Sequence, residues 1–341
     1  MERNHNVRAW GVAEPRGTLV PMNFLVPPLK STEVRIQVSH AGMCYSDVHL
    51  IDGDWGNASV YPQVCGHEIV GTIVARGTEV TRFELGQRVG VGWQQSACLS
   101  CEWCLGGDEQ LCDAMTATCA GGRLGGFADY LCCDNSFVFA LPDALPSPNA
   151  APLLCAGQTV YTALMGNCRP GDAVGVLGIG GLGHLAIQFA NKLGCRVTAI
   201  SSSESKRHEV VGLGAHRFVS SGSDGQELRN ASSTLDLLLV TTGAKQDWTR
   251  LVSLLRPKGT LCFAGMPAPI EVDIATLLSR RQAITTVSIG GRKDMSDMLR
   301  FAAQHKIVAT AEILPMSEIN QALEKLRHNQ VKYRIVLENP V

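Results

Sequence analysis

The sequence has no excess of charge of either sign and no long hydrophobic run. Lysine and arginine number 30 against 31 aspartate and glutamate, so the formal net charge is −1 at pH 7. Nucleic acids and anionic membranes attract basic surfaces, so neither partner is expected. No stretch reaches the length of a transmembrane helix, and the start of the chain, Met1–His5, lacks the apolar core of a secretory signal. We therefore expect a cytoplasmic protein without a membrane partner.

Extended disorder is not expected either. Hydrophobic residues make up 45% of the chain and charged residues only 18%, which is typical of a folded globular protein. With 341 residues, the chain is long enough for two domains and for a sizeable core.

What the chain does contain is 13 cysteines. Disulfides are rare in a reducing compartment, where clustered thiols indicate metal ligands and scattered ones indicate small buried side chains. One cluster lies within about residues 95–115 and consists of Cys98, Cys101, Cys104 and Cys112. Four thiolates at this spacing suit a closed tetrahedral zinc site. Such a site has no open position for substrate, so we expect it only to hold its own lobe in shape.

A second metal site is indicated by three segments that lie far apart in the chain: Cys44, the pair His67-Glu68, and Cys155. Each alone is weak evidence, because isolated cysteines and histidines are usually packing residues. A catalytic zinc keeps three protein ligands and one open position, and two cysteines with one histidine form a known set. The surroundings of Cys44 strengthen the hypothesis, because Ser46 and His49 place a hydroxyl and an imidazole just after the thiol.

The pattern of the chain changes at a proline-rich segment, residues 141–148. Residues 1–150 are predicted to be mostly β, with strands at 33–39, 68–75 and 87–91 between glycine and proline turns. Beyond this segment, strands and helices alternate, which predicts a parallel sheet with helices on both faces. The buried strands expected there are 173–177, 196–200, 235–240, 259–264 and 283–289, with a helix at 183–192. The tail is predicted to form amphipathic helices at 295–305 and 317–328 and a strand at 333–337.

A glycine-rich loop follows the strand at 173–177. It reads Gly178-Ile179-Gly180-Gly181-Leu182-Gly183 and opens the helix at 183–192. Glycines at these positions permit a tight turn, let backbone N–H groups approach a pyrophosphate, and allow close packing of helix on strand. Because the strand, loop, helix and second strand are all present, the loop predicts a dinucleotide site. It also predicts an α/β fold with a doubly wound parallel sheet of the Rossmann type.

The residues after the second strand, 196–200, favour NADP(H) over NAD(H). An acid at the end of this strand binds the ribose 2′-hydroxyl of NAD, but here the strand is followed by Ser201, Ser202 and Ser203. Small hydroxyls leave room for a 2′-phosphate, and Lys206 and Arg207 can neutralise it. The alternative for these two basic residues is a solvated helix start. Glu204 is the one nearby acid, and it lies past the strand end.

These residues together resemble the zinc-containing medium-chain alcohol dehydrogenases. The segment Gly66–Gly71, followed by Gly77 and Val80, resembles that family's zinc signature, and the resemblance extends from Val7 to the final strand. Within the family, the stretches at 52–56, 152–157 and 178–184 are most similar to the cinnamyl-alcohol-dehydrogenase branch, which includes bacterial NADP-dependent aldehyde reductases. The resemblance implies a mostly-β GroES-like catalytic domain of residues 1–150 and 289–341. It also implies a nucleotide-binding domain of residues 151–288.

The resemblance also implies roles for individual residues. Cys44, His67 and Cys155 would ligate the catalytic zinc, with Glu68 behind the metal and Asp47 accepting a hydrogen bond from His67. Ser46 would take the substrate's hydroxyl proton and pass it, through the nicotinamide ribose, to His49 and solvent. The remaining cofactor contacts would come from Thr159, Thr242, Gly265, Ser288, Ile289 and Gly290. Two departures from the branch are Cys65, where proline or alanine is frequent, and Gly290-Gly291, where plant members commonly have Gly-Ser.

The expected function is therefore that of an alcohol dehydrogenase that uses NADP(H) and carries two zinc ions per chain. It is expected to act as a reductase of aromatic or medium-to-long aliphatic aldehydes. Trp55 and Trp93 are candidate pocket walls, although one of them can simply pack in the β domain. Two alternatives remain: a polyol or sugar-alcohol dehydrogenase on the same fold, and a nucleotide-binding protein without catalysis. A small-molecule alcohol or aldehyde is the expected partner, and relatives suggest a homodimer or homotetramer.

Overall fold

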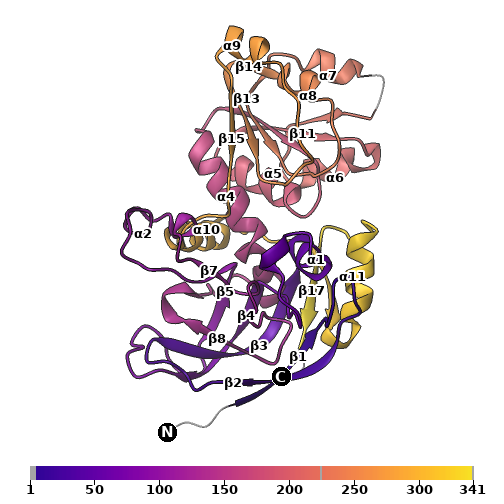
Figure 1. Cartoon of the computed structure of the whole chain (residues 1–341). Coiled ribbons are helices and arrows are strands. Elements are labelled where there is room, and N and C mark those ends of the chain that lie inside the picture. The colour runs from indigo at the N-terminus through magenta and orange to yellow at the C-terminus, as the bar shows by residue number, and fades with distance from the viewer. Residues whose placement is uncertain (1–4, 223–224, 340–341) are drawn as a thin grey trace. The chain divides into compact units, whose positions relative to one another are not determined.

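The computed structural model describes residues 5–222 and 225–339, which form two compact units (Figure 1). One unit consists of the residues up to Cys155 together with those from Gly291 onward, and the other is Ala156–Gly290. Residues 1–4, which begin the segment considered for a leader, lie outside the described ranges. No helix within those ranges is long and apolar enough to cross a membrane.

The first unit is mainly antiparallel β-sheet. Among its described residues, a seven-stranded sheet has the order β16-β17-β3-β4-β5-β9, with β8 also paired to β3, and two-stranded sheets join β1 to β2 and β6 to β7. The strands are β1 (His5–Gly11), β2 (Val20–Val26), β3 (Glu33–Met43), β4 (Glu68–Arg76), β5 (Arg88–Val91), β6 (Gln94–Ser96), β7 (Thr116–Ala117), β8 (Tyr130–Asp134), β9 (Val138–Ala140), β16 (Ala311–Pro315) and β17 (Arg334–Glu338). The helices are α1 (Tyr45–Asp52), α2 (Glu102–Gly106), α3 (Ser147–Ala150), α10 (Arg292–His305) and α11 (Ile319–Arg327).

The central strand β3 positions the first metal-binding segment. Val34, Ile36 and Val38 are buried and alternate with half-buried polar residues, the period of two expected when one sheet face covers the core. Antiparallel pairing places Gly42 of β3 opposite Glu68 of β4. The chain then leaves β3 at Met43 and begins α1 at Tyr45. Cys44 therefore lies at the junction of strand and helix, beside the start of β4.

The second unit is a parallel sheet with helices. Its described residues contain a six-stranded sheet of order β12-β11-β10-β13-β14-β15. The strands are β10 (Ala173–Leu177), β11 (Arg196–Ser201), β12 (Arg217–Ser220), β13 (Leu235–Val240), β14 (Leu255–Phe263) and β15 (Ala283–Thr286). The helices are α4 (Ala156–Asn167), α5 (Gly183–Lys192), α6 (Arg207–Gly212), α7 (Gln226–Asn230), α8 (Trp248–Val252) and α9 (Ile274–Arg280). Because β10 pairs with both β11 and β13, the strand order reverses there, and ligands of doubly wound sheets bind at such a switch point.

The sequence predicts several elements of this unit at their observed bounds, including β10, α5 and β13. The prediction of a buried strand at 283–289 is wrong in two respects. Strand β15 ends at Thr286, and Ala283, Ile284 and Thr286 are exposed, because β15 is the last strand of this sheet among the residues that the structure describes. Ile289 has a left-handed φ of 51°, which a β-strand cannot accommodate.

Candidate active site and metal centres

Asp47 connects the two segments that carry the first candidate ligands. Its side chain is fully buried. One oxygen, Oδ2, accepts a hydrogen bond from the Cys44 backbone N–H at 2.8 Å. The other, Oδ1, accepts from the Gly66 N–H at 2.9 Å and lies 3.1 Å from His67 Nδ1. Asp47 thereby fixes the ring of His67 with Nε2 directed away from it, the arrangement typical of metal-binding histidines.

The structure brings four candidate metal-site side chains together in the first unit. The ligand atoms of Cys44, His67, Glu68 and Cys155 all lie within 4.8 Å of one another. His67 Nε2 is buried and has no hydrogen-bond partner among the described residues, which is costly unless a ligand satisfies it. A hydrogen bond from the Cys155 thiol lowers the pKa of Cys44 well below its ordinary value, and the charge of Arg334 adds to this effect. An orphaned imidazole nitrogen beside two thiols suits a zinc ion with three protein ligands.

Glu68 forms a buried ion pair with Arg334 of β17. Glu68 is fully buried and Arg334 is 6% exposed, and the guanidinium Nη2 donates to Glu68 Oε1. Burial raises the pKa of Glu68 to about 7, against the opposing charge of Arg334. The residue opposite must be glycine, because a Cβ at Gly42 would lie 2.1 Å from Glu68 Oε2. Arg334 therefore supplies the positive charge next to the carboxylate and the two thiols.

Helix α1 and the turn after it carry a hydroxyl, an imidazole and a carboxylate near the cluster of Cys44, His67, Glu68 and Cys155. Ser46 Oγ lies 3.7 Å from Cys44 Sγ. One turn later, His49 Nδ1 lies 2.8 Å from Asp54 Oδ2, so the carboxylate orients the imidazole and leaves Nε2 available. The side chains of both His49 and Asp54 are partly exposed, which gives this end of the helix access to solvent.

Aromatic rings connect the two histidines. The rings of His49 and Trp55 stack at a centroid distance of 5.2 Å. Trp55 meets Trp93 edge to face at 5.9 Å, and Trp93 meets His67 in the same way at 5.1 Å. The two tryptophans thus lie next to each other, and Trp93 lies against the candidate metal ligand His67.

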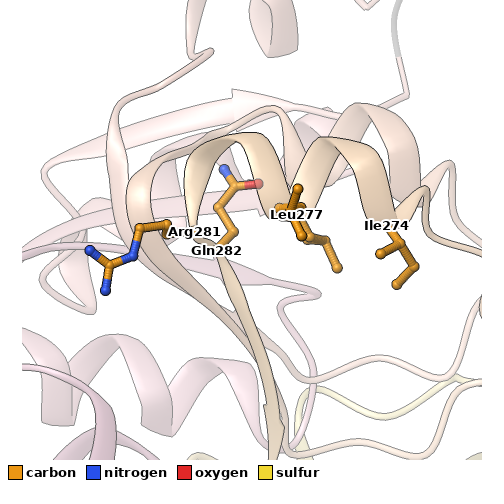
Figure 2. A pocket seen from close by; sticks show the side chains of 5 residues that line it. Ile274, Leu277, Arg281 and Gln282 are labelled. Carbon is orange, nitrogen blue, oxygen red and sulfur yellow. The ribbon is translucent and has the colours of Figure 1, made fainter.

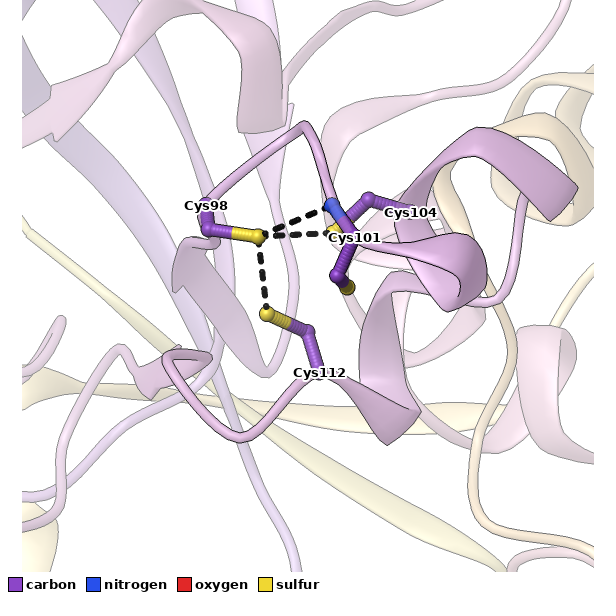
Figure 3. A group of neighbouring side chains, drawn as sticks. All are labelled: Cys98, Cys101, Cys104 and Cys112. Carbon is purple, nitrogen blue, oxygen red and sulfur yellow. Dashed lines mark hydrogen bonds between the residues drawn. The ribbon is translucent and has the colours of Figure 1, made fainter.

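The four clustered thiols converge as their spacing predicts (Figure 3). Cys98 Sγ lies 3.5 Å from Cys112 Sγ and 3.9 Å from Cys104 Sγ. Zinc–sulfur bonds of about 2.3 Å in a tetrahedron place the sulfur atoms ~3.8 Å apart, so these separations fit a zinc ion. Hydrogen bonds from backbone N–H groups, first that of Ser100, lower the pKa of Cys98 to about 6. A thiol held as thiolate near neutral pH is prepared for a metal.

The lobe that contains these thiols is fastened to helix α10. Glu109 is 2% exposed. Its carboxylate accepts hydrogen bonds from the Arg292 backbone N–H at 2.9 Å and from Arg292 Nε at 2.7 Å. A carboxylate at the first N–H groups of a helix satisfies them and favours the helix dipole. This contact explains why α10 begins at Arg292, three residues before the start predicted at 295.

In the second unit, the glycine loop connects β10 to α5. Gly178 has a φ of +89°, and a Cβ there would lie 2.7 Å from Thr242 Cβ. A Cβ at Gly183 would lie 2.0 Å from the Gly178 carbonyl oxygen, whereas one at Gly180 would meet nothing within 4 Å. The outer glycines are thus required by close packing, and Gly180 leaves open space above the N-terminus of the helix. Gly181 and Leu182 complete the loop, with Leu182 in the N-cap position of α5.

The serine run lies directly after β11. Ser201 is buried, and its Oγ accepts a hydrogen bond from the Ser203 N–H at 3.1 Å, while Ser202 is exposed. Lys206 Nζ donates to the carbonyl oxygen of Ile179 at 2.5 Å, which holds this ammonium against the glycine loop. Arg207 points elsewhere, because Glu204 and Glu227 both pair with its guanidinium.

The remaining predicted cofactor residues are all in the second unit. Thr159 is buried in α4. A Cβ at Gly265 would lie 3.2 Å from the Thr242 nitrogen, so these two positions are neighbours. The segment 287–290 has no regular secondary structure, and along it Ser288 is exposed whereas Gly290 is buried.

Comparison with known proteins identifies the family. Residues 30–143 match the model of the alcohol dehydrogenase GroES-like domain, and residues 181–304 match that of the zinc-binding dehydrogenase domain. The chain belongs to the zinc-containing medium-chain alcohol dehydrogenase family. A probable cinnamyl alcohol dehydrogenase of Oryza sativa subsp. japonica is 40% identical over 96% of this chain and 77% of its own length. The predicted resemblance to the cinnamyl-alcohol-dehydrogenase branch is confirmed.

Solved structures of the branch have the same fold. A cinnamyl alcohol dehydrogenase of Sorghum bicolor superposes with a TM-score of 0.93 at 36% identity, covering 98% of each chain. One from Helicobacter pylori, solved with NADP(H), superposes with a TM-score of 0.90 at 27% identity, again over 98% of each chain. The predicted fold class, a Rossmann-type sheet plus a mostly-β GroES-like domain, is confirmed.

Three side chains that pair with residues of this alcohol dehydrogenase's first unit were missed by the sequence analysis: Asp54, Arg334 and Arg292. Asp54 follows His49 by five residues, and that proximity was an available signal. Arg334 lies 266 residues from Glu68 and Arg292 lies 183 from Glu109. No spacing rule relates residues so far apart, so only the folded sheet and helix reveal these pairs.

Proposed function

We propose that this alcohol dehydrogenase uses NADP(H) and works as a reductase of aldehydes, with a catalytic zinc held by Cys44, His67 and Cys155. The observation that carries the proposal is the buried, unpartnered Nε2 of His67 within 4.8 Å of both thiols. A zinc ion there would act as a Lewis acid that polarises a carbonyl oxygen or acidifies a bound alcohol. We propose a second, structural zinc on Cys98, Cys101, Cys104 and Cys112.

The polar groups on α1 supply the proton that reduction requires. Ser46 lies beside Cys44, so its hydroxyl is placed to donate to the alkoxide oxygen formed from the carbonyl. Asp54 holds Nδ1 of His49, so Nε2 is the nitrogen that exchanges protons with the cofactor ribose and solvent. Asp47 and Glu68 act by position, the first by orienting His67 and the second by placing a carboxylate behind the ligands.

The nucleotide is proposed to bind over the glycine loop, with its pyrophosphate at the N-terminus of α5 and with hydride transfer supplied by the nicotinamide. Ser201, Ser202, Ser203 and Lys206 would surround the 2′-phosphate. Lys206 is placed for this role by its contact with Ile179, whereas Arg207 would first have to leave its two glutamate partners. The loss of affinity for NADPH should therefore be larger in Lys206→Ala than in Arg207→Ala. An equal loss in both variants would contradict this division of roles.

The substrate is proposed to be an aromatic or medium-to-long aliphatic aldehyde. The adjacent rings of Trp55 and Trp93, of which Trp93 meets His67, support this class, because flat apolar walls favour apolar side chains over polyhydroxylated ones. The test is a panel of cinnamaldehyde-type, benzaldehyde-type, aliphatic and polyol substrates, run with NADPH and with NADH. The proposal predicts the highest kcat/KM for the apolar aldehydes with NADPH. Higher kcat/KM for polyols, or equal rates with both cofactors, would overturn it.

A separate variant tests the proton path. Ser46→Ala should lower kcat by roughly two to four orders of magnitude, the usual contribution of a positioned acid or base, with zinc content unchanged. An unchanged kcat would remove Ser46 from the mechanism. Ser59→Ala, which removes a hydroxyl bonded to the Leu50 carbonyl oxygen rather than to the thiol cluster, is the matched control.

We also propose that the protein associates as a homodimer, or as a homotetramer built from such dimers, through the free edge of the second unit. Within the described ranges, strand β15 ends the sheet, and Ile284 on it is 39% exposed. On α9, which precedes β15 in the chain and packs against β14, Ile274 and Leu278 are 69% and 77% exposed. They line a groove with Leu277, Arg281 and Gln282 (Figure 2). An unpaired apolar edge is suited to pairing with a second copy. Ile284→Asp should lower the mass measured by light scattering to that of a smaller species, and an unchanged mass would exclude this edge.

A further inference from the structure

Two cysteines outside both metal clusters lie close together in the second unit. Cys195 Sγ and Cys168 Sγ are 3.6 Å apart, although the residues are 27 positions apart in the chain. Cys168 comes directly after α4 and is half-buried, and Cys195 comes directly before β11 and is 2% exposed. Neither thiol takes part in the sites described above.

Backbone hydrogen bonds hold the segment that follows Cys168 against the residues on both sides of Cys195. The Gly171 N–H donates to the Gly194 carbonyl oxygen at 2.8 Å, and the Arg196 N–H donates to that of Asp172 at 2.8 Å. A Cβ at Gly194 would lie only 3.4 Å from Pro170 Cβ. Because the segments are already held this closely, bringing the two sulfur atoms to bonding distance of about 2.05 Å requires side-chain movement rather than refolding.

We propose that Cys168 and Cys195 are a modification site, a dithiol that a hydroperoxide converts to a reversible intrachain disulfide. Cys168 is half-buried whereas Cys195 is buried, so peroxide reaches the Cys168 thiol more readily. As thiolate it attacks one peroxide oxygen, the O–O bond breaks, and with a proton from solvent the products are a sulfenic acid and water. Cys195 then attacks the sulfenic sulfur, the S–O bond breaks, and a second water leaves as the disulfide forms. In sum, two thiols lose two electrons and two protons to one hydrogen peroxide.

The position of the pair determines what the bond would do. Cys168 and Cys195 precede β10 and β11, whereas the glycine loop and the serine run follow those strands. The bond would therefore form at the amino-terminal ends of strands β10 and β11, opposite to the predicted nucleotide site at their carboxyl ends. It would leave that site open. It would link the end of α4 to the start of β11. Because the link lowers the conformational entropy of the unfolded chain, it would stabilise the folded protein. Burial raises the pKa of both thiols, so the reaction is slow and trapping it requires prolonged exposure.

The test is a peptide map of the full-length protein after exposure to hydrogen peroxide. Remaining thiols are blocked with iodoacetamide, and the protein is digested without reduction. The proposal predicts a linked pair of peptides containing Cys168 and Cys195, lighter by two hydrogen atoms than the two free peptides, that separates on treatment with dithiothreitol. Because the map identifies each peptide by its own mass, oxidation of Cys98, Cys101, Cys104 or Cys112 is distinguished from the Cys168–Cys195 bond.

Variants sharpen the result. In Cys195→Ser the linked pair must vanish, and Cys168 should be found as sulfinic acid. Cys262→Ser is the control, because Cys262 is another buried cysteine of the same unit whose pKa burial raises to about 11, and the linked pair should persist in it. Oxidised wild type should also lose activity on heating more slowly than the reduced form. Recovery of both cysteines as free or separately oxidised thiols in the wild type would overturn the proposal, whether or not the variants fold.

Discussion

Removal of Arg334 is expected to destabilise the first unit strongly. Arg334 is 6% exposed and pairs with Glu68, which is fully buried. Arg334→Met keeps much of the side-chain volume but leaves the Glu68 carboxylate buried without its cation. Breaking a buried pair on one side costs about 3–5 kcal/mol. The assay is urea unfolding of the zinc-loaded protein followed by tryptophan fluorescence, since Trp55 and Trp93 belong to the same unit.

Two further proteins make this measurement decisive. The double variant Glu68→Leu/Arg334→Met removes both charges and should recover most of the lost stability, because apolar replacements of a buried pair are often neutral. Arg8→Met, which breaks the exposed pair with Asp129, should change stability by less than about 1 kcal/mol. The reasoning fails if Arg334→Met is no less stable than Arg8→Met, or if the double variant is no more stable than the single one.

Two other predictions concern stability. Glu109→Ala removes the buried carboxylate that accepts two hydrogen bonds from the part-buried Arg292. It should cost about 1–3 kcal/mol of unfolding free energy, because both donors lose their acceptor. Urea unfolding measures this cost, and a neutral effect would show that α10 does not need this cap. Burial lowers the pKa of His40 below its ordinary 6.5, so protonation favours the unfolded chain and stability should fall as pH decreases through about 6.5. The variant His40→Gln should have a weaker pH dependence, and identical profiles would contradict this origin.

Local patterns explain why so much of the fold was predictable. An apolar run between Pro170-Gly171 and Gly178 gave β10, and one between serine and threonine residues gave β13, both at their observed bounds. The glycine loop gave the start of α5. The thiol cluster was equally predictable, because all four cysteines lie within a short segment of the sequence. Their spacing alone indicates that the thiols can meet around one metal ion. In both cases the interaction that fixes the structure acts between residues near each other in the chain.

Features that depend on distant partners could not be predicted in this way. An apolar strand pattern at 283–289 does not reveal whether the sheet continues beyond it, so the exposure of β15 was missed. The pairing of Arg207 with Glu227 was also hidden, so the sequence could not decide which of the two basic residues after β11 is placed for a phosphate and which belongs to a solvated helix start. The pairs Glu68–Arg334 and Glu109–Arg292 join the two ends of the first unit, and they follow only from its assembly.

The most direct test of the account is zinc analysis combined with NADPH oxidation for the wild type, Cys155→Ala and Cys98→Ala. The wild type should contain about two zinc ions per chain if both thiol clusters are filled. Cys155→Ala should lose about one zinc ion together with aldehyde reduction while still binding NADPH, whereas Cys98→Ala should lose the other ion with a loss of stability. A Cys155→Ala protein that keeps both zinc ions and its activity would contradict the assignment of the catalytic metal.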